Sequence, residues 1–245
     1  MTELVRGLVV RDRIPLNRIG KAMAKGMKAS VDNLALSQVS KELDLEALQT
    51  LRRAELTETE PRISLNVLLM AAVANMLSEH PYLNAELKDN QVVLFEPVNL
   101  GMAVSTSDGL VVTVVQEADK LTISQLAATI NDLGERAHSG QLGLSDIEGG
   151  TFTVSNLGMF GADSGMPIPR PPESAILLFG AVRPRAVVVE GQLLVHETCW
   201  ATLTYDHRYV DGVTAARFMQ GLSDLLEDPH KLLDLAGYLA EETGS

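Results

Sequence analysis

Thr204-Tyr205-Asp206-His207-Arg208-Tyr209-Val210-Asp211-Gly212 is the sharpest local pattern in this sequence. It follows a strand-like apolar run at 193–204 and precedes an amphipathic run at 212–226, so ionisable side chains gather where a strand ends and a helix begins. A histidine at such a point can act as a base, because imidazole exchanges its proton near neutral pH. The pattern marks His207 as a candidate general base, with Asp211 near the start of the next helix.

The same residues also allow a purely structural interpretation. Asp206 or Asp211 can cap the following helix, and His207 can simply hydrogen-bond within the turn. Composition alone favours this interpretation. The remaining histidines lie at predicted helix ends or in a strand, where solvated or capping roles are the default: His80, His138, His196 and His230.

A second pattern, Thr153-Val154-Ser155-Asn156-Leu157-Gly158-Met159-Phe160-Gly161, places hydroxyl and amide side chains at the end of a predicted strand, followed by glycines. Such glycine-rich turns after strands are common, so an ordinary loop is the alternative. By itself this pattern indicates only that Ser155 stands at a strand end.

Length and charge limit the classes of function. The 245 residues are 46% hydrophobic and 21% charged, which is typical of one large globular domain. The net charge of −12 predicts no nucleic-acid binding, since phosphate neutralisation requires clustered Lys and Arg, and it disfavours anionic membranes for the same reason.

Cysteine content and the N-terminus bear on the compartment. Cys199 is the only cysteine, so no internal disulfide and no zinc cluster are expected, and a buried, inert thiol is the expected state. The start of the chain, 1–13, mixes charges with short apolar runs and resembles neither a signal peptide nor a membrane span. We therefore expect a cytoplasmic protein.

Apolar periodicity and cap residues predict mixed helices and strands in one unit. Thr122 with Gln125 predicts a capping box, Ser64 a helix cap, and Glu190-Gly191 a hairpin. The predicted helices span 14–31, 45–53, 64–79, 122–138, 212–226 and 230–239. The predicted strands span 34–43, 92–95, 98–104, 110–115, 152–155, 175–182, 186–189 and 193–204. A Ser107-Asp108-Gly109 turn separates two of the strands, and Ser145 with Glu148 predicts a short turn.

Several motifs together carry a family resemblance. His207 to Gly212 is similar to the His-x-x-x-Asp-Gly active-site motif of dihydrolipoamide acyltransferase catalytic domains and of chloramphenicol acetyltransferase. The segment 149–158 is similar to the family's segment before the active-site loop. Further matches are Asn99-Leu100-Gly101-Met102-Ala103-Val104, Gly109-Leu110-Val111-Val112, Pro167-Ile168, Pro171-Pro172 and Ser174-Ala175-Ile176-Leu177. Nearly all of the chain thus resembles the catalytic domain of the acyltransferases of the 2-oxo-acid dehydrogenase complexes.

The resemblance implies a role for each matching residue. His207 is expected to take the proton from the attacking thiol, Ser155 to donate a hydrogen bond to the oxyanion of the tetrahedral intermediate, and Asp211 to hold the local structure. A positioned base has something to contribute, because a free thiol is mostly protonated at neutral pH. The resemblance implies coenzyme A as a substrate and no metal or covalent enzyme intermediate. It does not identify the residues that bind coenzyme A.

The resemblance also implies the fold and the assembly. The expected fold class is α/β (an α+β sandwich), chloramphenicol acetyltransferase-like, with a mixed sheet flanked by helices. Residues 1–245 are expected to form a single catalytic domain with no lipoyl domain and no peripheral-subunit-binding domain. A lipoyl-bearing protein then supplies the lipoamide, and other dehydrogenase-complex subunits are partners. A homotrimer is expected, with each active site between two chains.

Three departures from the family leave alternatives open. The residues before Ile14 leave no room for the family's usual N-terminal domains, the first helix has Gly20 and Gly26 where the family commonly has arginines, and an acidic tail at 234–245 leaves a larger cage in question. One alternative is a free-standing acyltransferase that uses coenzyme A and a small-molecule acceptor. Another is a non-catalytic assembly subunit of a dehydrogenase complex. The acyl chain is not predicted.

Overall fold

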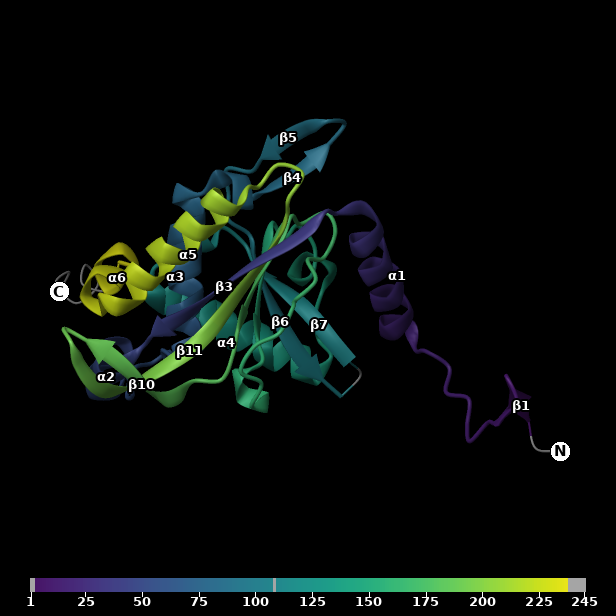
Figure 1. Ribbon diagram of the computed structural model, residues 1–245, viewed down its shortest axis with the longest axis horizontal. Coiled ribbons are helices and arrows are strands. Elements are labelled where there is room, and N and C mark those ends of the chain that lie inside the picture. The colour runs from purple at the N-terminus through teal and green to yellow at the C-terminus, as the bar shows by residue number, and fades with distance from the viewer. Residues whose placement is uncertain (1–2, 108, 238–245) are drawn as a thin grey trace.

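A seven-stranded mixed sheet forms the centre of the computed structural model, which describes residues 3–107 and 109–237 (Figure 1). The strands of this sheet are β3 (Leu36–Asp44), β6 (Leu100–Thr106), β7 (Gly109–Val115), β8 (Phe152–Asn156), β9 (Ala175–Phe179), β10 (Arg183–Val189) and β11 (Gln192–Asp206). Their order is β10-β11-β9-β8-β6-β7, and β3 also pairs with β11. The pairs β6–β8 and β8–β9 are parallel and the others antiparallel, so the predicted mixed sheet is confirmed.

Helices flank the sheet, and all of them except the first enclose the apolar core. They are α1 (Arg18–Asn33), α2 (Glu46–Glu55), α3 (Leu65–Glu79), α4 (Ile123–Ser139), α5 (Gly212–Glu227) and α6 (Pro229–Leu235). α3 is apolar on nearly every face and packs against α4 and α5, because it lies inside the molecule rather than on its surface. Phe152 of the sheet and Phe218 of α5 are fully buried, with ring centroids 6.1 Å apart.

α1 and the N-terminal segment lie apart from this core. Figure 1 shows α1 on the opposite side of the molecule from α6, with the chain before it extending away from the sheet. The segment carries a two-residue pairing of β1 (Leu4–Val5) with β2 (Leu8–Val9), whose side chains are exposed. No helix among residues 3–107 and 109–237 has the length and apolar character needed to cross a membrane.

Cap residues predicted from the sequence are found where expected. Ser64 accepts a hydrogen bond from the Val67 amide at the start of α3. Thr122 and Gln125 form a capping box at the start of α4, and Gly140 ends that helix with a φ of 69°. Local side-chain chemistry fixes these ends, so single residues predict them well.

Several predicted boundaries differ from the structure. The first helix begins at Arg18 rather than 14, because Asn17 caps it through the Gly20 amide. The strand predicted at 175–182 ends at Phe179, because the chain beyond it pairs with the loop at 162–163, where the Ala181 amide donates to the Ala162 carbonyl. The turn near Ser145 exists, but Asp146 accepts the Gly143 amide in place of a Ser145–Glu148 box. The short strands β1, β2 and β4 (Ala85–Lys88), which pairs with β5 (Gln91–Leu94), were not predicted.

Two predictions reach beyond the described residues. The last predicted helix, 230–239, is observed as α6, which ends at Leu235, and the final two predicted positions lie outside the described residues. The turn predicted at 107–109 joins β6 to β7, and Asp108 lies outside them.

Candidate active site

His207 directly follows the last residue of β11 and is exposed. Its backbone N–H donates to the carbonyl of Ala35, 2.8 Å away, in the segment that leads into β3. Its ring lies 5.6 Å from the ring of Tyr205, centroid to centroid. The imidazole is therefore presented at the sheet edge by a backbone anchored to a neighbouring strand.

Asp206 holds the turn that presents His207. The Asp206 side chain is buried, and its carboxylate accepts hydrogen bonds from Nε and Nη2 of Arg208 at 2.9 and 2.6 Å and from the Ala35 amide at 3.2 Å. These contacts raise the pKa of Arg208 above its ordinary value. Asp206 was one of two aspartates predicted as possible helix caps. Its side chain does not cap the helix but connects the end of β11 to the segment before β3 and to the turn.

Asp211 is the helix cap. Its Oδ1 accepts the Thr214 amide at 2.7 Å at the start of α5. This hydrogen bond, assisted by smaller contributions that include the nearby His207, lowers the pKa of Asp211. Asp211 is therefore an ionised, fully exposed group, and its contact supports a role in holding the turn between β11 and α5.

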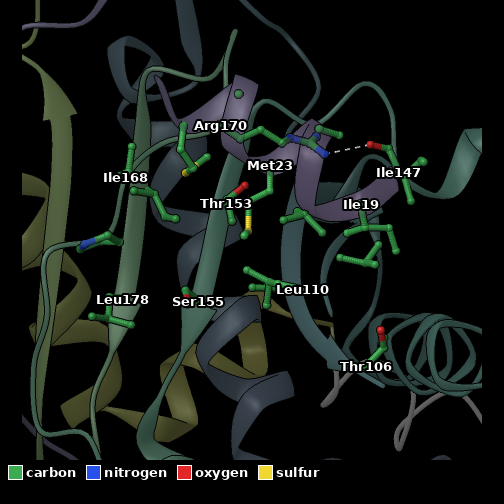
Figure 2. A pocket seen from close by; sticks show the side chains of 18 of the residues that line it. Ile19, Met23, Thr106, Leu110, Ile147, Thr153, Ser155, Ile168, Arg170 and Leu178 are labelled. Carbon is green, nitrogen blue, oxygen red and sulfur yellow. Dashed lines mark hydrogen bonds between the residues drawn. The ribbon is translucent and has the colours of Figure 1, made fainter. Parts of the chain in front are cut away.

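Ser155 lies near the end of β8, half-buried, on the wall of a cavity of about 880 Å³ (Figure 2). Thr153 lies two residues earlier and faces the same cavity, as strand alternation requires. Within the described part of the chain the Ser155 hydroxyl has no hydrogen-bond partner, so it is available to donate to a ligand. The sequence pattern placed Ser155 correctly at a strand end but gave no sign of the cavity.

Segments within 19–27, 103–112 and 137–178 line the cavity, which is partly open to solvent, with Met23 and Leu110 of its lining half-exposed. α1 covers it from one side, and the face of β6, β7, β8 and β9 that carries Ser155 forms its floor. The loop before β9 contributes Ile168 and Arg170. The lining is apolar almost throughout, which is the usual character of a small-molecule site.

A buried charge network, which the sequence did not reveal, supports the cavity wall. The Glu173 side chain is fully buried and accepts a hydrogen bond from the Thr153 hydroxyl at 2.5 Å. Nη2 and Nε of Arg170 lie 3.3 Å from Glu173 Oε1, and Nη1 of Arg170 donates to the Ile147 carbonyl at 3.0 Å. In the sequence, this network is visible only as two charged residues in a proline-rich loop that precedes a wholly apolar strand.

Glu173→Gln is expected to become more stable relative to the native chain as pH rises. Burial raises the pKa of Glu173, and the contacts with Thr153 and Arg170 oppose this shift without cancelling it. Above the ordinary pKa of about 4.5 the unfolded state releases this proton first, so the free energy of unfolding of the native chain falls until pH passes the folded-state value. One proton gives a slope of at most about 1.4 kcal/mol per pH unit.

Urea unfolding at several pH values from 4 upward measures that difference. Glu148→Gln, which removes a carboxylate from an exposed position, controls for the change in net charge. A constant difference between Glu173→Gln and the native chain across the series would contradict the raised pKa of Glu173.

Strand register separates Ser155 from His207 within one chain. Ser155 and Thr202 both lie opposite Leu178 of β9, Ser155 on β8 and Thr202 on β11. His207 is a further five residues along β11. Rises of ~3.3 Å per residue and strand spacings of ~4.8 Å put the two side chains roughly 20 Å apart. One chain does not bring them together, and His207 does not line the cavity.

Cys199 is buried, and two of the other histidines have structural partners. Burial raises the pKa of the Cys199 thiol to about 12, as expected for an inert buried cysteine. His196 contacts Asp44 at 2.5 Å, and His80 packs edge-on against Phe218. His207 and Ser155 are therefore the groups best suited to chemistry.

Comparison with known proteins gives consistent matches. The family model for 2-oxoacid dehydrogenases acyltransferase (catalytic domain) matches residues 10–234. The chain is 35% identical over 229 residues, 91% of its length, to the dihydrolipoyllysine-residue succinyltransferase component of the 2-oxoglutarate dehydrogenase complex of Bartonella vinsonii subsp. berkhoffii. It is 33% identical over 90% of its length to that component of Haemophilus influenzae. It spans just over half the length of these relatives, 56% and 55%.

Solved structures agree with these matches. Dihydrolipoamide acetyltransferase of Azotobacter vinelandii, studied for the catalytic roles of a serine, a histidine and an asparagine, superposes with a TM-score of 0.88 at 32% identity, covering 93% of this chain and 96% of that one. A chloramphenicol acetyltransferase superposes with a TM-score of 0.53 at 16% identity over 82% of this chain and 94% of that one. The second match shows the shared fold, and the predicted chloramphenicol acetyltransferase-like fold is confirmed.

Proposed function

Since the chain belongs to the 2-oxoacid dehydrogenase acyltransferase (catalytic domain) family, we propose that it transfers an acyl group between coenzyme A and dihydrolipoamide. The observation that carries the proposal is the combination of this family match with an available serine hydroxyl in a ligand-sized cavity and an anchored, exposed histidine. No metal takes part in the proposed reaction. Another chain or module supplies the lipoamide.

The spacing of the proposed catalytic residues supports their roles. In the Azotobacter enzyme the studied serine and histidine are 52 positions apart, and the asparagine follows the histidine by four. Here Ser155 and His207 are also 52 positions apart, and Asp211 follows His207 by four. The third position differs, since an aspartate stands where that enzyme has an asparagine. We assign His207 as the base, Ser155 as the oxyanion donor and Asp211 as the residue that holds the turn.

The proposed reaction proceeds through a tetrahedral intermediate. The His207 imidazole accepts the proton of the attacking thiol, and the resulting thiolate adds to the thioester carbonyl carbon. The carbonyl oxygen becomes an oxyanion, which the Ser155 hydroxyl stabilises by donating a hydrogen bond. When the intermediate collapses, the carbon–sulfur bond of the leaving thiol breaks, and that thiolate takes the proton back from the imidazolium. The same steps in reverse order carry the acyl group in the opposite direction.

The proposal requires more than one chain. Ser155 and His207 of one chain lie roughly 20 Å apart, and a hydrogen-bonded transition state needs both groups within a few ångströms of the reacting carbon. Each site therefore combines His207 of one protomer with Ser155 of a neighbour. A homotrimer supplies three such sites, and it can assemble further into a cage with the other complex subunits. The proposed location is the cytoplasm, where Cys199 stays reduced.

Transfer from acetyl-CoA to free dihydrolipoamide is the expected activity. Release of coenzyme A, followed with a thiol-independent readout such as chromatography of the acyl products, measures it. Sedimentation of the same sample gives the native mass, which is expected to be at least three times the 26.4 kDa chain mass. A stable assembly that shows no transfer would contradict the proposed function and favour an assembly subunit. Transfer to other acceptors alone would favour a free-standing acyltransferase.

A further inference from the structure

The lining of the Ser155 cavity offers almost no charged side chain to a ligand. Among the described residues that line it, the one charged side chain is Arg170. The others near Ser155 are aliphatic or small, and Figure 2 shows Met23, Leu110 and Leu178 directed into the same hollow as Ser155 and Thr153. A group bound here meets hydrocarbon on most sides.

Arg170 is not free to bind an anionic ligand. Its guanidinium lies 3.3 Å from the carboxylate of Glu173, which is fully buried and has the guanidinium as its charged partner. A further N–H of Arg170 is donated to the Ile147 carbonyl. With Glu173 ionised, the pair contributes no net charge to the cavity, and withdrawing Arg170 toward a ligand would leave the buried carboxylate uncompensated, which is strongly unfavourable.

The surroundings of the Ser155 hydroxyl are apolar at the level of the sheet. Leu178 lies beside Ser155 in the β8–β9 register. Continuing the β6–β8 register one step past the Met102–Val154 pair sets Ala103 on the other side, and Val112 lies beyond it on β7. Both flanking residues line the cavity, and Ala103 is small enough to leave space next to the hydroxyl. These aliphatic side chains are therefore the ones next to any group that accepts a hydrogen bond from Ser155 within the cavity.

The turn at 206–211 that carries His207 has no net positive charge when its imidazole is neutral. The turn carries two negative side chains, Asp206 and Asp211, and one positive side chain, Arg208. The Arg208 guanidinium is already hydrogen-bonded to the Asp206 carboxylate. The pKa of Asp211 is lowered, so it remains ionised and disfavours a second carboxylate nearby.

We propose that the acyl group is uncharged and apolar, short branched chains included, and that the cavity discriminates against acyl groups that carry a terminal carboxylate. This inference rests on the proposed function and names its substrate class. A carboxylate buried against hydrocarbon without a free cation loses its hydration with nothing to replace it. The chain therefore differs from the relatives described as succinyltransferases, whose acyl group ends in a carboxylate.

The test compares acyl-CoA donors with free dihydrolipoamide as the acceptor. We expect kcat/KM for acetyl-CoA and isobutyryl-CoA to exceed that for succinyl-CoA by roughly tenfold or more. A value for succinyl-CoA equal to or above the other two would overturn the inference and leave the proposed function intact. No transfer from any of the three donors would remove the proposed function itself, so the two failures are distinguishable.

Two variants place a cation in the cavity to test its assignment as the acyl site. Leu110 and Met23 line the cavity, and each is 49% exposed, so both positions should tolerate lysine. Leu110→Lys is expected to raise the succinyl-to-isobutyryl ratio of kcat/KM by about tenfold, whereas the neutral control Leu110→Met leaves it unchanged. Met23→Lys with Met23→Leu repeats the comparison from α1. Folded lysine variants with an unchanged ratio at both positions would show that the acyl chain lies elsewhere.

Discussion

Replacing His207 with alanine is expected to lower the rate of acyl transfer by roughly 10²-fold or more, because the attacking thiol then loses its proton without a positioned base. The effect should fall on kcat more than on KM, since the imidazole acts on the proton in transit and does little to hold either substrate. Steady-state kinetics with acetyl-CoA and dihydrolipoamide measure it. The fold should persist, because the contact that anchors this position uses the backbone N–H of His207.

His230→Ala is a matched control for the His207 variant. His230 is exposed at the start of α6, in a different part of the chain from the turn at 206–211, so its replacement should leave transfer unchanged. A His207→Ala protein with native circular dichroism and native activity would remove His207 from the mechanism.

Replacing Ser155 with alanine is expected to lower kcat by roughly 10²- to 10³-fold, the usual cost of losing one oxyanion donor. The hydroxyl has no intrachain partner among residues 3–107 and 109–237, so its removal leaves no buried group unsatisfied and stability should change little. Rapid-quench measurement of the chemical step, beside thermal unfolding, separates the two effects. Ser145→Ala, at an exposed position near α4, controls for loss of a hydroxyl.

Mixing the two inactive variants tests whether each site is shared between chains. Assemblies formed from equal amounts of His207→Ala and Ser155→Ala chains contain some sites that combine the intact serine of one chain with the intact histidine of the other. Random mixing restores about a quarter of the sites when the two groups come from different protomers. No recovery from assemblies shown by mass to be mixed would mean that one chain provides both groups, against the strand register.

Local features of the sequence predicted local features of the structure. Thr122 with Gln125, Ser64 and Gly140 each act on the nearest few backbone groups, so the helix ends that they define were found without knowledge of the fold. The first helix was extended too far because the apolar periodicity continues before Asn17, and periodicity does not show which polar residue acts as the cap.

Features that depend on contacts between distant segments were not predictable in the same way. No sequence motif distinguishes Arg170 and Glu173. Their ion pair forms only because the loop before β9 packs against Thr153 and Ile147. The roughly 20 Å between Ser155 and His207 follows from which strands pair and in what register. The cavity and its apolar lining likewise depend on α1 lying across strands that are distant in sequence.

The separation of Ser155 and His207 within one chain determines how many active sites of an assembly a defective chain inactivates. If a fraction of the chains lacks both groups and chains associate at random into the proposed homotrimer, the surviving fraction of sites is the square of the intact fraction, because each proposed site draws on two polypeptides. A single doubly defective polypeptide in a ring of three silences two of the three sites. With a normal copy expressed equally beside it, about a quarter of the shared sites survive, whereas about half survive in an enzyme with self-contained sites.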